Sequence, residues 1–437
     1  MISVRKIFIS VVFTSAIIVL TMGSAAAFTA TDPGVRGGPA GAGGQLPGLT
    51  LEESDFFSAG LAVFTEVEAV PDGLGPRFNS DSCVGCHSQP AIGGTSPVVN
   101  PLFEVANKNG ATNVVPFFIQ PDGPIREARF IFNPDGTRDG GVHDLFTITG
   151  RQDATGCNIA QPDFVTAAKK RNLIFRIPTP VFGAGLIENI PDNVIIDNMN
   201  ADRIRKRALN ISGHPNLSGN DGTITRFGWK AQNKSPLIFS GEAYNVEMGV
   251  TNELFTQERD ETQGCLFNPL PEDRTNFLAN AATDVPSDFV LFSIFMQLLA
   301  QPTPAPDTPS IVNGRALFGQ IGCTMCHTPT LTTGTTAIGA LSNQPANLYS
   351  DLLLHNMGLG LADNILQGNA GPAEFRTAPL WGLGQRIFFL HDGRTKDLRQ
   401  AIREHASVGS EANKVILAFS LLNETQKQNI LNFLRSL

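Results

Sequence analysis

Two short stretches decide what this chain can be: CVGCH at residues 83–87 and CTMCH at residues 323–327. In each, two thiols are spaced to bond the vinyl groups of one haem, and the next residue is a His that can ligate its iron. A zinc ribbon would need four converging ligands, and a thioredoxin-like dithiol needs no trailing His. The motifs therefore predict two covalently bound haem c groups, with His87 and His327 as proximal iron ligands. The attachment residues are Cys83, Cys86, Cys323 and Cys326.

Residues 1–27 have the three regions of a cleavable signal peptide. Arg5 and Lys6 precede an apolar run over residues 7–22, and small residues end the stretch at Ala27. A membrane anchor is the alternative, but the run is shorter than the about 20 apolar residues that a spanning helix needs. We expect cleavage after Ala27 and export to the periplasm, and no membrane span in the mature chain.

Composition and charge narrow the class of protein further. The chain has 437 residues and a formal net charge of −8, which becomes −10 when Arg5 and Lys6 are removed with the signal peptide. This acidic balance argues against nucleic acid as a partner. Of the six cysteines, Cys157 and Cys265 are not used by the haem motifs. An oxidising compartment would let these two form a disulfide if the fold brings them together.

Glycine and proline mark the expected domain boundaries. Residues 28–50 are too rich in both for a regular element and are predicted to form an extended arm. The Pro-rich stretch 301–309 is predicted to be a semi-rigid linker. It separates an N-terminal haem c domain, residues 51–300, from a C-terminal cytochrome c domain, residues 310–437.

The two predicted domains repeat each other in sequence. GLAVF at 60–64 precedes the first haem motif as GRALF at 314–318 precedes the second, and Phe-Arg at 175–176 recurs at 375–376. The repeat predicts a mainly α fold with two cytochrome c-like haem domains. The first is enlarged by a loop-rich insertion over residues 100–170 with some β structure.

The sequence also predicts some β structure in the insertion and a helix at the C-terminus. Apolar residues punctuated by Gly, Asp and Pro predict short strands and loops in the insertion; they are Phe103, Val114, Val115, Phe117, Phe118, Phe130, Ile131, Phe132, Leu145 and Phe146. Asn423 followed by Gln426 has the capping-box pattern of a helix start.

Several longer strings carry a family resemblance. They are DPGVRGG at 32–38, GLGPRFN at 73–79, PTPVFGAGLIENIPD at 178–192, RFGWKA at 226–231, LYSDLLLHNMG at 348–358, FRTAPLWGLG at 375–384 and FFLHDGR at 388–394. With these strings the chain resembles the di-haem oxidoreductase family of peroxidase-like proteins, also called thiol oxidoreductases. That family is similar to the bacterial di-haem cytochrome c peroxidases. The resemblance covers nearly all of the mature chain and implies an oxidoreductase.

The resemblance implies a distal ligand for the C-terminal haem, usually Met, at a fixed spacing after a His-Asp-Gly motif. Here His405 stands fourteen residues after His391. We expect His405 to ligate the second iron and to give it a lower potential than a Met would. The alternatives are an exposed His405, or His355 as the ligand. His391 and Asp392 are expected to lie near this haem without ligating it.

The first haem lacks an evident distal ligand. Residues 88–110, where the resemblance implies a His, contain none. We expect an open position at this iron where a small oxidant binds, unless His143 closes it. His214 lies in a Gly/Asn/Ser-rich loop and is expected at the surface.

Two further residues match the peroxidase pattern. Glu247, in NVEMG at 245–249, resembles the residue that moves the proton during cleavage of the peroxide O–O bond. Trp229 falls where the resemblance implies a Trp between the two haems that relays electrons. The alternatives without a catalytic role are that Glu247 lies at the surface and that Trp229 only packs in the core. Core packing is also the role expected of Trp381.

These predictions describe an exported di-haem c-type oxidoreductase. Hydrogen peroxide is the expected oxidant and a small redox protein the expected electron donor. The alternatives are oxidation of a thiol or organic substrate at the same site, a pure electron carrier with two closed haems, and a sensor that binds a small gas. Calcium is doubtful, because residues 386–390 lack the Thr and Pro that the peroxidases offer there.

Overall fold

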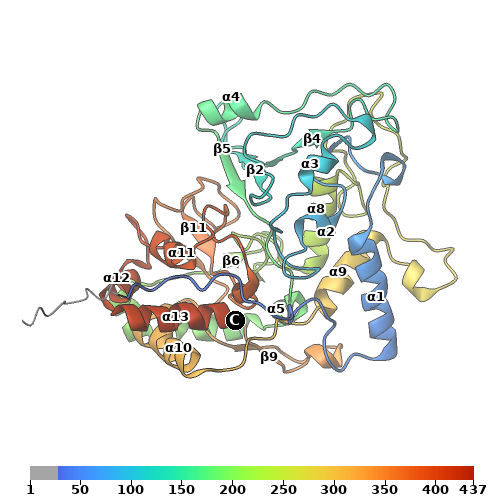
Figure 1. Ribbon diagram of the computed structural model, residues 1–437. Helices are drawn as coiled ribbons and strands as arrows, with labels where there is room; N and C mark the ends of the chain where they lie inside the picture. Colours follow the sequence, from blue (N-terminus) through green and yellow to red (C-terminus); the bar gives the residue numbers. More distant parts are fainter. Residues whose placement is uncertain (1–27) are drawn as a thin grey trace, which may run out of the picture.

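The computed structural model describes residues 28–437, so the predicted signal peptide lies outside the described residues. The mainly α class is confirmed, since the strands are only two to four residues long (Figure 1). The longer helices are α1 (Leu51–Thr65), α8 (Pro236–Met248), α9 (Asp288–Leu298), α10 (Pro309–Ile321), α12 (Asn413–Leu421) and α13 (Glu424–Ser436). Within residues 28–437, we find no helix with the length and apolar character needed to cross a membrane.

Short elements make up the rest of the fold. The remaining helices are α2 (Cys83–Cys86), α3 (Leu102–Val105), α4 (Phe164–Lys169), α5 (Ala184–Glu188), α7 (Arg203–Leu209), α11 (Leu398–Glu404) and α6 (Asp192–Asn200), which with nine residues is as long as α12. The 3-10 turns are η1 (Val70–Asp72), η2 (Lys108–Gly110), η3 (Ala282–Asp284), η4 (Cys323–Met325), η5 (Gly339–Leu341) and η6 (Leu383–Gln385). The strands are β1 (Arg77–Phe78), β2 (Glu127–Phe130), β3 (Val142–His143), β4 (Phe146–Thr147), β5 (Leu173–Arg176), β6 (Asn216–Leu217), β7 (Ile224–Thr225), β8 (Leu331–Thr332), β9 (Pro345–Ala346), β10 (Leu354–Asn356) and β11 (Glu374–Arg376).

Each half of the molecule contains a closely packed pair of helices that leads into its haem motif. α1 packs on α9 in the first half, and α10 packs on α13 in the second. A glycine stands at each crossing. A Cβ atom added to Gly60 would lie 2.5 Å from the carbonyl oxygen of Leu291, and one added to Gly314 would lie 1.9 Å from that of Asn429. The repeated sequence therefore corresponds to a repeated packing feature, a glycine at a close crossing of two helices.

One turn after each glycine, a phenylalanine reaches the histidine of the nearby motif. The ring of Phe64 lies 6.2 Å from that of His87, and the ring of Phe318 lies 6.1 Å from that of His327. Since residues i and i+4 share one helix face, the Gly-to-Phe spacing directs both residues inward. The same helix thus packs on its partner and orients the motif.

The insertion contains β structure, as expected, but fewer strands than the sequence suggests. Strands β3, β2 and β5 form an antiparallel sheet in that order, with Ala128 opposite His143 on one side and Phe175 on the other. Of the candidate strand residues, Phe130 lies in β2 and Phe146 in β4. Phe103 lies in α3 instead. The remaining residues of the set lie outside the named strands, in the loops that were also expected: Val114, Val115, Phe117, Phe118, Ile131, Phe132 and Leu145. In this loop Phe118 is buried, whereas Val114 and Phe117 are exposed.

The Gly/Pro-rich arm is tied down along its length. Asp32 pairs with Arg435 of α13 at 2.7 Å, and the Leu46 amide donates to the carbonyl oxygen of Leu298 at 2.8 Å. The arm, dark blue in Figure 1, therefore bonds to both halves of the molecule. The first apolar core also takes in residues between 331 and 353 together with Trp381, so the two halves share buried contacts across the 301–309 stretch.

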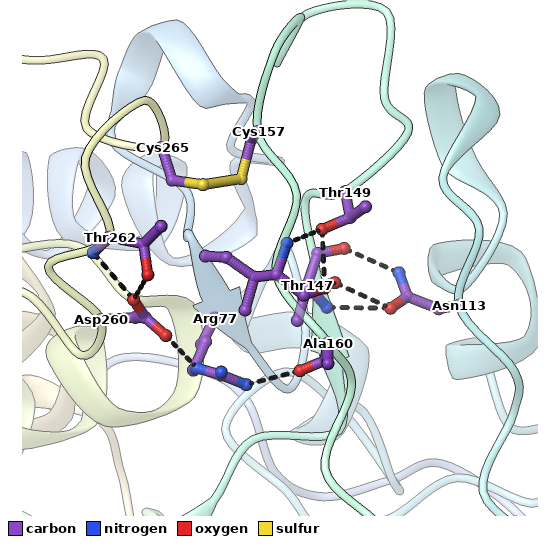
Figure 2. The surroundings of a disulfide bond; sticks show 10 residues. Arg77, Asn113, Thr147, Thr149, Cys157, Ala160, Asp260, Thr262 and Cys265 are labelled. Carbon is purple, nitrogen blue, oxygen red and sulfur yellow. Dashed lines mark hydrogen bonds and ion pairs between the residues drawn. A yellow bond between two sulfur atoms is a disulfide. The ribbon is translucent and has the colours of Figure 1, made fainter.

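A disulfide joins Cys157 in the insertion to Cys265 in the loop that follows α8, which confirms the pairing considered from the sequence (Figure 2). Beside it, Arg77 of β1 donates to Asp260 at 2.7 Å and to the carbonyl oxygen of Ala160 at 3.1 Å. The insertion and this loop are therefore connected by a disulfide and by Arg77, which hydrogen-bonds to both segments.

Candidate functional site

Each haem motif opens onto a large cavity. The first cavity has a volume of about 1300 Å³ and is lined by Cys83, Cys86 and His87 together with residues of β2 and α8. The second, of about 1310 Å³, is lined by Cys323, Cys326 and His327 together with residues of β11 and α11. The predicted attachment residues are thus brought together in two separate groups of three.

The motif histidines are held in the form that binds a metal. Nδ1 of His87 lies 2.9 Å from the carbonyl oxygen of Gly94, and Nδ1 of His327 lies 2.9 Å from that of Tyr349. A nitrogen that faces a carbonyl oxygen must carry the proton, so Nε2 keeps its lone pair. Burial lowers the pKa of both rings, that of His327 to about 4, which keeps them neutral. These residues fit iron ligation.

His405 has the same arrangement on the other side of the second cavity. It follows the last residue of α11, and its Nδ1 lies 2.8 Å from the carbonyl oxygen of Ala401, one turn earlier. Burial lowers the pKa of this ring too. His405 lines the same cavity as His327 and leaves Nε2 without a hydrogen bond among the described residues. Its geometry therefore fits a second axial ligand.

The rival, His355, is engaged through both ring nitrogens. Nε2 lies 2.9 Å from a carboxylate oxygen of Asp351, and Nδ1 lies 2.8 Å from one of Glu411. Burial lowers the pKa of this ring, but Cys326, whose Sγ lies 3.7 Å from Nδ1, and Asp351 raise it well above its ordinary value, so the ring is held as a cation. A cationic imidazole has no lone pair to give to iron.

The other histidines also have partners of their own. His391 lines the second cavity and stacks on Phe375, with ring centroids 4.4 Å apart. His143 bonds Asp139 at 2.8 Å and stacks on Phe130 at 3.7 Å, away from the first cavity. His214 bonds Glu374 at 3.0 Å and its side chain is 43% exposed, in line with the surface position that was expected. Among residues 28–437, His87 is the one histidine that lines the first cavity.

Glu247 lies in the last turn of α8 and lines the first cavity. The side-chain amide of Asn79 donates to its carboxylate at 2.7 Å, while the oxygen of the same amide accepts from the Leu145 backbone at 2.7 Å. Burial and the nearby Glu127 carboxylate raise the pKa of Glu247 above its ordinary value. A carboxylate that is held in place and ready to take a proton fits acid-base chemistry.

Trp229 stands at the boundary of the two cavities and lines both of them. Its indole N–H donates to the carbonyl oxygen of Ile177 at 2.8 Å, and its own carbonyl oxygen accepts from the Arg376 backbone at 2.9 Å. The indole is thus fixed between a segment that follows β5 and the end of β11. An aromatic ring here is placed to connect the two sites.

Sequence reasoning missed some residues of these sites. Asn79 stands inside GLGPRFN, but only the fold brings it to Glu247, which is 168 positions away. Glu127 and Arg129 of β2 also line the first cavity, from a strand that no motif marked. Arg376 and Arg386 line the second cavity, and of these the internal repeat singled out Arg376 without showing its surroundings.

Comparison with known proteins identifies the family. The family described as "Di-haem oxidoreductase, putative peroxidase" matches residues 129–437, and the chain belongs to it. It is therefore an oxidoreductase of a peroxidase-like family whose members use haem. No curated protein sequence matches the chain.

Solved structures give more distant similarity. A MauG-like protein associated with microbial copper homeostasis is 18% identical with a TM-score of 0.25, over 34% of this chain. The chain spans about half, 52%, of that protein. The diheme peroxidase BthA from Burkholderia thailandensis is 14% identical with a TM-score of 0.29, over 72% of this chain and 94% of its own. Hydrazine synthase from Kuenenia stuttgartiensis is 12% identical with a TM-score of 0.35, over 99% and 100%.

Proposed function

We propose that this chain is an exported, periplasmic di-haem peroxidase with one haem c bound covalently in each cavity. The observation that carries the proposal is the pair of cavities, each lined by two cysteines and a histidine whose Nε2 is free to bind iron. Bound iron would supply the redox chemistry, namely the two electrons that reduce hydrogen peroxide to water. The residues of the chain would decide which cavity receives the peroxide.

The two cavities differ in what faces the motif histidine. In the second, His405 is arranged as a further ligand, so this site would be closed and suited to storing an electron. In the first, a carboxylate and an amide face the cavity where a second histidine is missing among the described residues. The first cavity would therefore take the peroxide. The engaged His143 weakens the alternative of a pure electron carrier.

Glu247 would move the proton that peroxide cleavage requires. Its carboxylate would accept a proton from one peroxide oxygen and return it to the other oxygen, which leaves as water. Asn79 would hold the carboxylate toward the cavity, since it donates to one of its oxygens. Trp229 would relay electrons from the second cavity to the first, because its indole lines both.

Turnover of hydrogen peroxide by the haem-loaded protein, with an artificial electron donor, tests this function. Glu247→Gln is nearly isosteric but cannot take the proton, so turnover should fall by a factor on the order of 10² to 10⁴ with both haems bound. Glu104→Gln, at an exposed position, is the matched control and should match wild type. Wild-type activity in Glu247→Gln would remove this residue from the mechanism.

The pH profile gives a second readout of the same carboxylate. Turnover needs Glu247 ionised, so it should fall as the pH drops through the raised pKa of this group. Glu127→Gln removes a like charge near Glu247 and should lower that pKa, which moves the acid limb of the profile to lower pH. An unchanged limb would contradict the assignment. No peroxide turnover in wild type would favour oxidation of a thiol or organic substrate at this site.

A further inference from the structure

Two arginines at the second cavity are buried without an anionic partner. Arg376 and Arg386 are each only 8% exposed, and both line the cavity that contains His327 and His405. Arg376 donates from Nε to the carbonyl oxygen of Gly228 at 3.0 Å. The Arg386 side chain has no hydrogen bond within residues 28–437, and neither guanidinium forms an ion pair with a described carboxylate. Two like charges therefore face one apolar space.

The first half of the repeat shows how the fold treats the corresponding residue. Arg176, which matches Arg376 in the repeated Phe-Arg pair, lines the first cavity and binds the buried Asp363 at 2.7 Å. Asp363 also accepts from Lys230 at 3.1 Å, so this carboxylate neutralises part of a cationic cluster. Among the described residues, no carboxylate forms an ion pair with Arg376 or Arg386. The contrast indicates that their anion comes from outside the chain.

The cost of burying such charges explains why a ligand is required. Burial alone lowers the pKa of Arg386 to about 10, and burial together with repulsion from Arg386 lowers that of Arg376 to about 10. An unpaired buried charge is strongly destabilising unless an opposite charge comes into contact with it. Guanidinium groups are suited to carboxylates, since their planar donors match the two oxygens.

We propose that Arg376 and Arg386 form the binding site for the propionate carboxylates of the haem in the second cavity. The proposal rests on the haem occupancy of the proposed function, but not on its peroxidase activity. Both arginines also line a smaller cavity, of about 610 Å³, which Trp229 shares with them. The anion would therefore lie beside the indole, on the side of the second cavity that faces the first.

The test is the reduction potential of the second haem as a function of pH in the haem-loaded protein. In Arg386→Met and Arg376→Met, the propionate loses a cation, so its pKa should rise and the potential should fall at neutral pH. The potential should then rise again as acid protonates the propionate. The propionate bending bands in the resonance Raman spectrum should shift as well. Arg315→Met, which removes a surface pair with Asp307, is the control and should match wild type.

Other ionisable groups of the cavity are present in every variant, so the difference from wild type isolates the arginine. They are His327, His355, His391, His405 and Glu411. Wild-type potentials and Raman bands in both Met variants, with the second haem bound, would overturn the proposal. If a Met variant does not bind the haem, Arg386→Lys is the deciding variant. Shifted propionate Raman bands in Arg386→Lys would support the site, because Lys cannot reproduce the planar contact of a guanidinium. Wild-type propionate bands would overturn it. A wild-type protein without a second haem would instead refute the proposed function.

Discussion

The protonated nitrogen of each histidine separates the candidate ligands from the other rings. His87, His327 and His405 each face a backbone carbonyl oxygen with Nδ1 and leave Nε2 toward a cavity. His355 and His143 face carboxylates instead. A carbonyl oxygen keeps the proton on Nδ1 and leaves the Nε2 lone pair for iron, whereas His355 has a carboxylate at each ring nitrogen and a raised pKa, which favours its cation.

His405→Met tests the ligand set of the second haem. The thioether should keep this haem six-coordinate and low-spin but raise its potential, because Met ligation favours Fe(II). His405→Gly should convert the haem to high-spin, and His355→Gln should leave it low-spin. Electron paramagnetic resonance of the oxidised protein, together with a redox titration, measures both. The reverse result, in which only the His355 variant loses the low-spin signal, would make His355 the ligand.

Among the secondary-structure elements, the two helix crossings hold the haem motifs in place. α10 carries Gly314 against α13 and, one turn later, Phe318 against His327. Phe318 also packs edge-on against Phe433 of α13, with ring centroids 5.4 Å apart. Any change that separates α10 from α13 should therefore move the motif as well as weaken the core.

Gly314→Ala should destabilise the protein, since its Cβ would meet the carbonyl oxygen of Asn429 and force the helices apart. We expect a loss of about 1–3 kcal/mol, as for an overpacked core. Gly319→Ala is the matched control on the same helix, because its Cβ would meet nothing closer than 3.9 Å. It should stabilise the helix by about 0.5–1 kcal/mol. Denaturant unfolding of both variants checks this, and equal effects would contradict the role of the crossing.

For the molecule as a whole, long-range ties connect segments that are distant in sequence. The arm before residue 50 bonds to both halves, and the disulfide closes a sequence separation of 108 residues between the insertion and the loop after α8. Arg77 adds a polar tie between the same two segments. These contacts stabilise the insertion, whose residues Glu127, Arg129 and Leu145 line the first cavity.

Cys157→Ser combined with Cys265→Ser should lower the free energy of unfolding by about 2–5 kcal/mol, because the unfolded chain loses a long covalent loop. Haem absorption spectra should not change, since neither sulfur lines a haem cavity. Arg77→Met, with the disulfide intact, should cost less. Thermal unfolding with and without a dithiol reductant provides the measurement. A disulfide-free protein that unfolds at the wild-type temperature would contradict the prediction.

The sequence predicted the helices better than the strands. The capping box at Asn423 and Gln426 starts α13 as expected, because a cap involves residues three positions apart. The apolar residues Phe117 and Phe118 lie in a loop, where Phe118 is buried and Phe117 is exposed, so apolar character alone did not separate strand from loop. Local patterns report local hydrogen bonds, whereas burial depends on contacts far along the chain.

The two Cys-x-x-Cys-His motifs and the family strings, by themselves, indicated a haem-using oxidoreductase family, to which the chain belongs. The motifs also predict covalent attachment, because the residues that it needs are adjacent in sequence. The tertiary structure alone decided which histidine keeps a free lone pair, that Trp229 lines both cavities, and that Asn79 holds Glu247. It also left Arg376 and Arg386 facing one cavity without a carboxylate. The burial, tautomer and pKa of a side chain depend on its neighbours in space, and at these sites the neighbours come from segments that are distant in sequence.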